Sequence, residues 1–259
     1  MPDDTTTTAQ VIEATPEDIS CILAWLKREY DKDGEGFWCN HNLISDSLDS
    51  PGDIWVIRRN GAAVAFQLGR YSADILSVRK DHRKMGLGAA LVQASVERAL
   101  GDDVNALSVQ CQPKESLGFW ERMGFVRYGD LNPYSDVKAR RILPRTFDLP
   151  IASSPIEVVI GFYPESAAYG DAKDVLPIAE QHLVGVNAND GSIMLNQRVI
   201  GLSDLGEESR DTVVKVVVHG VVRCFCKAKN ECARTVGVQH DSLGDTYFID
   251  RVNPIDGKG

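Results

Sequence analysis

The sequence predicts an α+β protein in two parts, and three observations lead to this class. In the first 150 residues, short runs rich in β-branched residues alternate with segments whose apolar residues recur at helical spacing. A glycine-containing stretch joins one such strand to one such helix. After "LPIASSP", residues 149–155, the pattern becomes valine-rich and loses its long helical segments. We therefore expect a flexible tail over 1–9, a mixed domain over 10–149 and a smaller, mainly-β domain over 150–259.

The first domain is expected to open with a strand at 10–15 and a helix from Pro16. Thr15 is suited to cap this helix, because Pro16 takes its first position and Asp18 lies three residues after the cap. A second short helix is expected within 36–52. A hairpin over 53–72 follows, since Asn60-Gly61 supplies the positive φ angles of a tight turn.

The rest of this domain is expected to hold a strand at 73–78, a glycine-led helix, a strand at 104–111, a short helix ending at Gly124 and two closing strands. In the second domain, "RDTVVKVVVHGVVRCFCKAKN" predicts a hairpin that turns near His219-Gly220. "ARTVGVQHD" and "DTYFIDRVN" predict further strands. We find no internal repeat between the halves.

Composition restricts the class of protein. The chain has 259 residues, of which 43% are hydrophobic and 25% charged, as expected of a packed soluble protein. No apolar run reaches the roughly 18–20 residues that span a bilayer, and the N-terminus lacks the pattern of a secretory signal. We therefore expect a cytoplasmic protein with reduced thiols at its six cysteines and no membrane partner.

The formal net charge of -9 argues against an extended nucleic-acid surface. It is compatible with cationic acceptors such as amines, although solubility alone also explains it.

The stretch "SVRKDHRKMGLGAALVQ" is the strongest candidate for a binding site. Glycines at 86 and 88 allow close approach of a ligand, and the first N–H groups of the following helix lack intrahelical partners, which favours an anion there. Arg83 and Lys84 add positive charge. A P-loop is excluded because Ala89-Ala90 follows the second glycine, and a Rossmann fingerprint is excluded because position 91 is Leu. The alternative is that the glycines only begin a tightly packed helix.

The wider context resembles the GNAT acyltransferases. "VRKDHRKMGLGAALV" resembles their acetyl-CoA-binding motif, in which a strand ending in Val leads into Arg/Gln-x-x-Gly-x-Gly/Ala. "GFWERMGF", residues 118–125, resembles their second signature, usually close to Phe-Tyr-Glu-Lys-Leu-Gly-Phe. The element order also agrees. The resemblance covers about residues 10–149 and implies the GNAT fold, with a central mixed β-sheet flanked by helices; it does not extend into the second domain.

The resemblance implies acetyl-CoA as co-substrate and assigns a set of cofactor-binding residues. Backbone N–H groups of the loop would hold the pyrophosphate of coenzyme A, and the strand before it would pair with the pantetheine arm like an added strand. An N–H near Val78 would polarise the thioester carbonyl as an oxyanion donor. The residues so assigned are Leu76, Val78, Arg79, Arg83, Lys84, Met85, Gly86, Leu87, Gly88, Ala89 and Trp120.

Acyl transfer to an amine needs a group that takes the amine proton and one that protonates the leaving thiolate. Asp74 is the candidate base, because some family members carry a carboxylate on this strand; the alternative is an ordinary solvated carboxylate. Trp120 stands where the family commonly has a Tyr acid, and an indole is not a practical proton donor. Pro113, beside Gln112, stands where the family often has a cofactor-contacting Asn.

These differences from the usual family residues leave three possibilities open. Tyr128 or Tyr134 supplies the acid, water protonates the thiolate, or the domain has lost catalysis.

The second domain carries no catalytic motif, and its role is unknown. Cys224, Cys226, Cys232 and two nearby histidines raise the question of zinc. A one-residue gap on a strand is not the usual Cys-x(2–4)-Cys spacing, so we expect no metal there. The valine-rich strands suggest association with the first domain, a second copy or a protein partner.

Two main functions follow: an N-acetyltransferase acting on a primary amine of a small molecule or protein, or a degenerate GNAT domain that serves as a scaffold. Modification of nucleic acid bases is a third, disfavoured by the charge.

Overall fold

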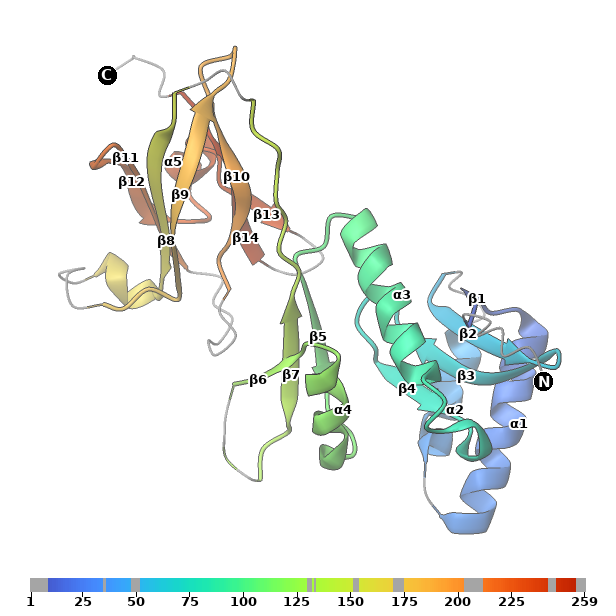
Figure 1. Ribbon diagram of the computed structural model, residues 1–259. Helices are drawn as coiled ribbons and strands as arrows, with labels where there is room; N and C mark the ends of the chain where they lie inside the picture. Colours follow the sequence, from blue (N-terminus) through green and yellow to red (C-terminus); the bar gives the residue numbers. More distant parts are fainter. Residues whose placement is uncertain are drawn as a thin grey trace. The chain divides into compact units, whose positions relative to one another are not determined.

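The computed structural model divides into two compact units that we describe separately (Figure 1). The first comprises the described part of Met1–Asp103 together with Leu107–Phe125, and the second comprises Val104–Ala106 and the described part of Val126–Gly259. No helix among the described residues is both long and apolar enough to cross a bilayer. The structure describes residues 9–34, 36–47, 52–129, 132, 134–150, 154–169, 175–202, 212–241 and 246–254.

The first unit is built on a four-stranded antiparallel sheet with the strand order β1-β2-β3-β4. The strands are β1 (Val11–Glu13), β2 (Ile54–Arg59), β3 (Ala62–Leu68) and β4 (Ile75–Val78). The helices are α1 (Pro16–Asp33), α2 (His41–Asp46), α3 (Leu87–Gly101) and α4 (Leu117–Arg122). The short 3-10 helices are η1 (Phe37–Asn40), η3 (Lys80–His82) and η4 (Lys114–Ser116). The strand β5 (Ala106–Gln110) crosses the boundary between the units.

Local sequence signals explain several element boundaries. Thr15 caps α1, and the capping box with Asp18 is complete, as predicted. Asn60 and Gly61 adopt positive φ angles of 52° and 78° in the β2–β3 turn, which confirms the predicted hairpin. α4 ends just before Gly124, whose φ is 81°.

Helices pack on both faces of the first sheet (Figure 1). One face carries Val56 and Phe66, which pack with Trp25 of α1 in one core cluster. The other face carries Ile57, which packs with Leu91 of α3 in a second cluster. Neighbouring strand residues thus point to opposite sides, as the pleat requires. The α+β class and the predicted sheet flanked by helices are confirmed.

The second unit is dominated by a seven-stranded antiparallel sheet with the order β12-β11-β8-β9-β10-β14-β13. Its strands are β8 (Ile156–Tyr163), β9 (Ala179–Asn187), β10 (Ile193–Ile200), β11 (Val213–Val218), β12 (Val221–Lys227), β13 (Gln239–Asp241) and β14 (Thr246–Val252). It also contains η5 (Glu165–Ala168), the short helix α5 (Glu231–Thr235), and the pair β6 (Val126–Tyr128) and β7 (Lys138–Ile142). The mainly-β character predicted for this part of the chain is confirmed.

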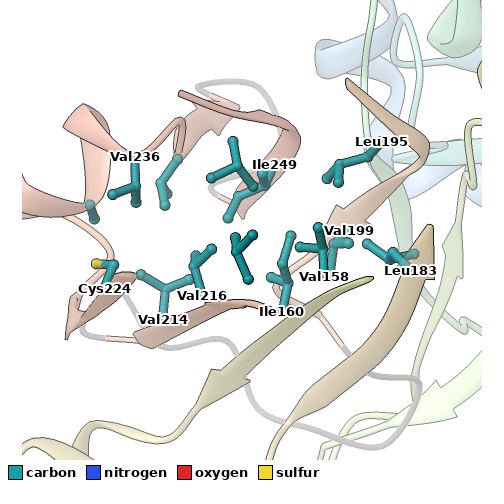
Figure 2. Close-up of a cluster of buried hydrophobic side chains, with 14 of the residues drawn as sticks. Val158, Ile160, Leu183, Leu195, Val199, Val214, Val216, Cys224, Val236 and Ile249 are labelled. Atoms are coloured by element: carbon teal, nitrogen blue, oxygen red, sulfur yellow. The ribbon is translucent and has the colours of Figure 1, made fainter. Parts of the chain in front are cut away.

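The large sheet curves around one apolar core (Figure 2). Val158, Ile160 and Val216 contribute fully buried side chains from neighbouring strands. Cys224 lies at one end of the cluster, near Val214 and Val236. Burial of valine and isoleucine on one face explains the valine-rich pattern of this segment.

One predicted strand is corrected. "ARTVGVQHD" was expected to be extended throughout, but Ala233–Thr235 belong to α5 and only Gln239–Asp241 are extended. Ala233 is fully buried and Val236 nearly so, and both pack into the core cluster. Tertiary burial of these two side chains thus favours a helical turn where the local pattern suggested a strand. The hairpin at His219-Gly220 is confirmed, with φ angles of 49° and 75°.

The first unit ends at Phe125, so β6 and β7 group with the second unit although the sequence placed them at the end of the first domain. The domain boundary near residue 150 stays a prediction. Residues 1–8 of the expected tail and 151–153 of the expected linker lie outside the described residues.

Candidate functional site

β4 is the last strand in the order of its sheet, and its backbone is the first component of the candidate site. The N–H of Arg79 donates to the carbonyl of Val64 in β3 at 2.9 Å. Because hydrogen-bonded positions alternate along antiparallel strands, Ser77 also turns its backbone groups toward β3. Leu76 and Val78 therefore turn theirs toward the open edge, where an extended ligand arm can pair as an added strand.

The glycine loop between β4 and α3 is the second component. Gly86 takes the cap position of α3 with a φ of 77°, and a Cβ built on it would meet nothing within 4 Å. Gly88 is buried, and an added Cβ would be in ordinary van der Waals contact, 3.4 Å from the Phe119 ring. Gly86 is therefore the glycine that the loop requires, because it allows the left-handed turn and leaves the helix end open.

Charged side chains around the loop are held by local bonds. The Nε atom of Arg83 donates to the Val78 carbonyl at 3.0 Å, so this arginine folds back toward the strand end. Arg79 forms a two-pronged pair with Asp81 at 2.7 and 3.0 Å. Together with the His82 ring, this pair lowers the pKa of Asp81 to about 2.

The remaining predicted loop residues divide into exposed and buried ones. Lys84 and Met85 are exposed, and Lys84 has a positive φ of 64°. Leu87 is buried in the cluster beneath α3, and Ala89 is half-buried. The loop thus presents backbone and cationic groups outward while Leu87 anchors it.

Two cavities of the first unit lie along β4, and both are lined by Phe37, Asn40 and Gln112. The larger has a volume of about 740 Å³ and the smaller about 260 Å³. The larger is further lined by Leu26, Glu29, Gly36, Cys39, Ser77, Lys80, Arg83, Pro113 and Glu115. The smaller is further lined by Ala73, Asp74, Leu76, Gln110, Ser116, Phe119 and Trp120.

Two carboxylates in the larger cavity were missed by sequence reasoning. Glu29 comes from α1 and accepts the N–H of Lys80 at 2.8 Å, and Glu115 comes from η4. Nothing in the sequence distinguishes them from solvated helix carboxylates, because they are 86 positions apart in the chain. Lys80 and Arg83 line the same cavity, so its formal charges balance, and Glu29 and Glu115 supply individual carboxylates that a cationic amine can bind.

Asp74 lies directly before β4 and lines the smaller cavity. Burial raises the pKa of its carboxyl, and the negative charge of Asp53 raises it further. A Cβ on Gly69 would lie 2.1 Å from the Ser72 carbonyl oxygen, so the turn before Asp74 requires glycine at this position. A raised pKa makes this carboxylate a stronger base than an ordinary aspartate, which suits it to accept a proton in the smaller cavity.

Trp120 is only 6% exposed and has two sets of neighbours. Its ring packs edge-on against Phe119 and Phe125, with centroid distances of 5.1 Å to each. It also lines the smaller cavity. Trp120 therefore both packs in the core and lines the smaller cavity.

The two tyrosines predicted as alternative acids belong to the second unit. Tyr128 ends β6, and the Arg140 guanidinium lies 3.9 Å from its ring centroid. Tyr134 is 93% exposed. Their catalytic role stays a prediction.

Comparison with known proteins agrees with the two signatures. Residues 50–127 match the family model described as an acetyltransferase (GNAT) domain. Among curated proteins, no relative matches the chain.

Solved structures resemble about half of the chain. Ard1 from Thermoplasma volcanium is 22% identical, with a TM-score of 0.43, over 53% of this chain and 99% of its own. The PaiA N-acetyltransferase from Thermoplasma acidophilum, solved with coenzyme A, is 15% identical, with a TM-score of 0.39, over 53% and 100%. A ribosomal-protein-alanine N-acetyltransferase from Brucella melitensis is 18% identical, with a TM-score of 0.38, over 52% and 99%.

The family match spans the β2–β3 hairpin, β4, the glycine loop, α3 and the α4 signature, whereas α1 and η1, which also line the cavities, lie outside the matched residues. The predicted resemblance is therefore confirmed over residues 50–127, which match the GNAT acetyltransferase domain.

Proposed function

We propose that the first unit transfers an acetyl group from acetyl-CoA to a primary amine of a small molecule or protein. The observation that carries this proposal is the conjunction of an outward-facing β4 edge with an open helix N-terminus at Gly86, beside two cavities. The match to the GNAT domain implies acyl transfer from coenzyme A, and these features fit the parts of that co-substrate.

Each part of the co-substrate finds a complementary group. Backbone N–H groups at the start of α3, with Arg83 and Lys84 beside them, fit the diphosphate. The edge groups of Leu76 fit an amide of the pantetheine arm, which leaves the Val78 N–H for the thioester carbonyl. Because Arg83 already bonds the Val78 carbonyl, that carbonyl pairs with the arm only if the arginine moves.

The chain's own residues then have distinct roles in the reaction. Asp74, directly or through water, takes the proton of the attacking amine, and the carboxylates of Glu29 and Glu115 attract the amine as a cation. The Val78 N–H stabilises the oxyanion that develops on the thioester carbonyl. As the C–S bond breaks, the thiolate takes its proton from water, since Trp120 has no acidic O–H.

Binding of acetyl-CoA to a matched pair of variants tests the cofactor site. Gly86→Glu places a negative charge at the helix start, where the diphosphate is proposed to lie. Gly61→Glu is the control, because its φ of 78° nearly equals the 77° of Gly86 and its added Cβ also meets nothing within 4 Å. Calorimetry should show micromolar binding by the wild type and the control, and at least about 100-fold weaker binding by Gly86→Glu.

Release of free thiol with a panel of primary amines tests catalysis. Turnover that depends on both amine and acetyl-CoA supports the transferase. Binding without turnover on any amine supports a scaffold that retains its cofactor site. No binding by the wild type rejects both the loop as a cofactor site and the transferase, and it favours the scaffold alternative.

A further inference from the structure

Three sulfur atoms converge in the second unit. Cys224 and Cys226 belong to β12, and Cys232 belongs to α5. The three Sγ atoms all lie within 4.8 Å of one another, and those of Cys224 and Cys226 are 3.4 Å apart. Ligands of a tetrahedral ion with metal–sulfur bonds of about 2.3 Å stand roughly 3.8 Å apart, a separation that the Cys224–Cys226 pair approaches.

The strand register explains why the first two cysteines point the same way. Cys224 pairs with Val216 and Cys226 pairs with Val214, and both valines are fully buried in the core cluster. Opposed residues of an antiparallel pair share a face, so both thiols lie on the core side of β12. The one-residue gap that argued against chelation is what places both sulfurs on this face.

The third cysteine is brought to the same place by the turn after β12. The N–H of Asn230 donates to the Lys227 carbonyl at 2.9 Å, and α5 follows directly. α5 is anchored by Ala233, which is fully buried in the same core. The Sγ of Cys224 lies 3.9 Å from the Cys232 carbonyl oxygen, which fixes helix against strand. The three positions are thus held by packed backbone.

Cys226 and Cys232 form a disulfide in the structure, which corrects the expectation that all six cysteines are reduced, and their Cα atoms are 7.1 Å apart. This separation exceeds the about 4.4–6.8 Å that disulfides usually span. Two thiolates on one ion stand farther apart than two covalently bonded sulfurs, so ion binding accommodates a wider Cα separation. The third sulfur, on Cys224, has no part in a disulfide but completes a three-ligand set.

We propose that the reduced protein binds one zinc ion through the thiolates of Cys224, Cys226 and Cys232, with water as fourth ligand. Zinc accepts thiolate ligands in tetrahedral geometry and takes water where the protein supplies three ligands. Three thiols lose their protons to the solvent as three Zn–S bonds form. Cys232 is exposed and Cys226 half-buried, so the ion enters from the helix side. This site is independent of acetyl transfer.

The test uses the full chain, treated with a phosphine that reduces the disulfide to two thiols and is itself oxidised. After removal of metal, Zn²⁺ is titrated in competition with a chromophoric chelator. We expect one ion per chain, and X-ray absorption should show three sulfur neighbours at about 2.3 Å. Cys224→Ser, Cys226→Ser and Cys232→Ser should each weaken binding at least about 100-fold, whereas Cys21→Ser and Cys39→Ser, in the first unit, should not.

Cobalt substitution of the wild type provides a second readout in case a serine variant fails to fold. Co²⁺ should give the visible absorption of a tetrahedral site together with thiolate-to-metal charge transfer. The proposal is overturned if the reduced wild type binds no zinc, if the triple serine variant retains it, or if cobalt shows only the weak spectrum of an octahedral aqua ion.

Discussion

At the scale of single residues, Asp74 has the clearest expected effect. Its pKa is raised above the ordinary aspartate value of 3.8, first by burial and then by the charge of Asp53. Since only the carboxylate accepts a proton, kcat/KM should rise with pH as Asp74 ionises. Asp74→Asn should lower kcat/KM about 100-fold or more and remove this acidic limb, as measured by thiol release across pH.

Asp53→Asn is the matched control for that experiment. It removes the neighbouring negative charge while keeping the proposed base, so the midpoint of the acidic limb should move to lower pH with little loss of maximal rate. An unchanged pH profile in Asp74→Asn, with acetyl-CoA binding intact, would assign proton removal to another group.

At the scale of elements, the capping-box residue Asp18 at the start of α1 is also a buried charge. Asp18 accepts the Thr15 N–H at 2.9 Å and two bonds from the Arg58 guanidinium, at 2.7 and 2.5 Å. Burial alone would raise the pKa of Asp18, but the bonds from Arg58 and Thr15 hold it below its usual value. The ionised carboxylate thus ties the helix to β2 as well as capping it.

Asp18→Asn should therefore destabilise the protein by about 1–2 kcal/mol at neutral pH, as measured by denaturant unfolding. Because the pKa of Asp18 is depressed in the folded protein, the wild-type advantage is complete above the ordinary aspartate pKa of 3.8 and disappears as pH falls below it. Asp31→Asn is the control on the same helix, since its pair with Lys27 is exposed and worth at most about 0.5 kcal/mol. Equal effects of the two substitutions would contradict the capping role.

Elements with local signals were predictable, and those set by distant contacts were not. The α1 cap and the turns at Asn60-Gly61 and His219-Gly220 follow from residues next to one another in the chain. The helical turn at α5 depends on a core built by other strands. The functional sites divide in the same way. The glycine loop was predictable because its residues are neighbours in the chain, whereas the cavity carboxylates and the third cysteine are brought into place only by folding.

At the scale of the whole molecule, a buried network of hydrogen bonds ties the short segment around Asn105 to the second unit. Asn105 is fully buried, and its side chain donates to Asp241 at 3.1 Å and Thr246 at 3.3 Å. Arg198 donates to the Asn105 side-chain oxygen at 2.9 Å and pairs with Asp250. The sequence pattern alone assigns residue 105 to the first domain, because its partners lie more than 90 positions away.

Asn105→Ala should therefore destabilise the second unit by about 2–3 kcal/mol, since it removes buried partners of Asp241 and Arg198. Asn187→Ala is the control within this unit, because Asn187 is exposed at the end of β9 and its loss should cost less than about 0.5 kcal/mol. Hydrogen exchange resolved by segment should show faster exchange in β10 and β14 with β2 and β3 unchanged. Faster exchange confined to the first unit would contradict the assignment of Asn105 to the second unit. It would favour the predicted domain boundary near residue 150.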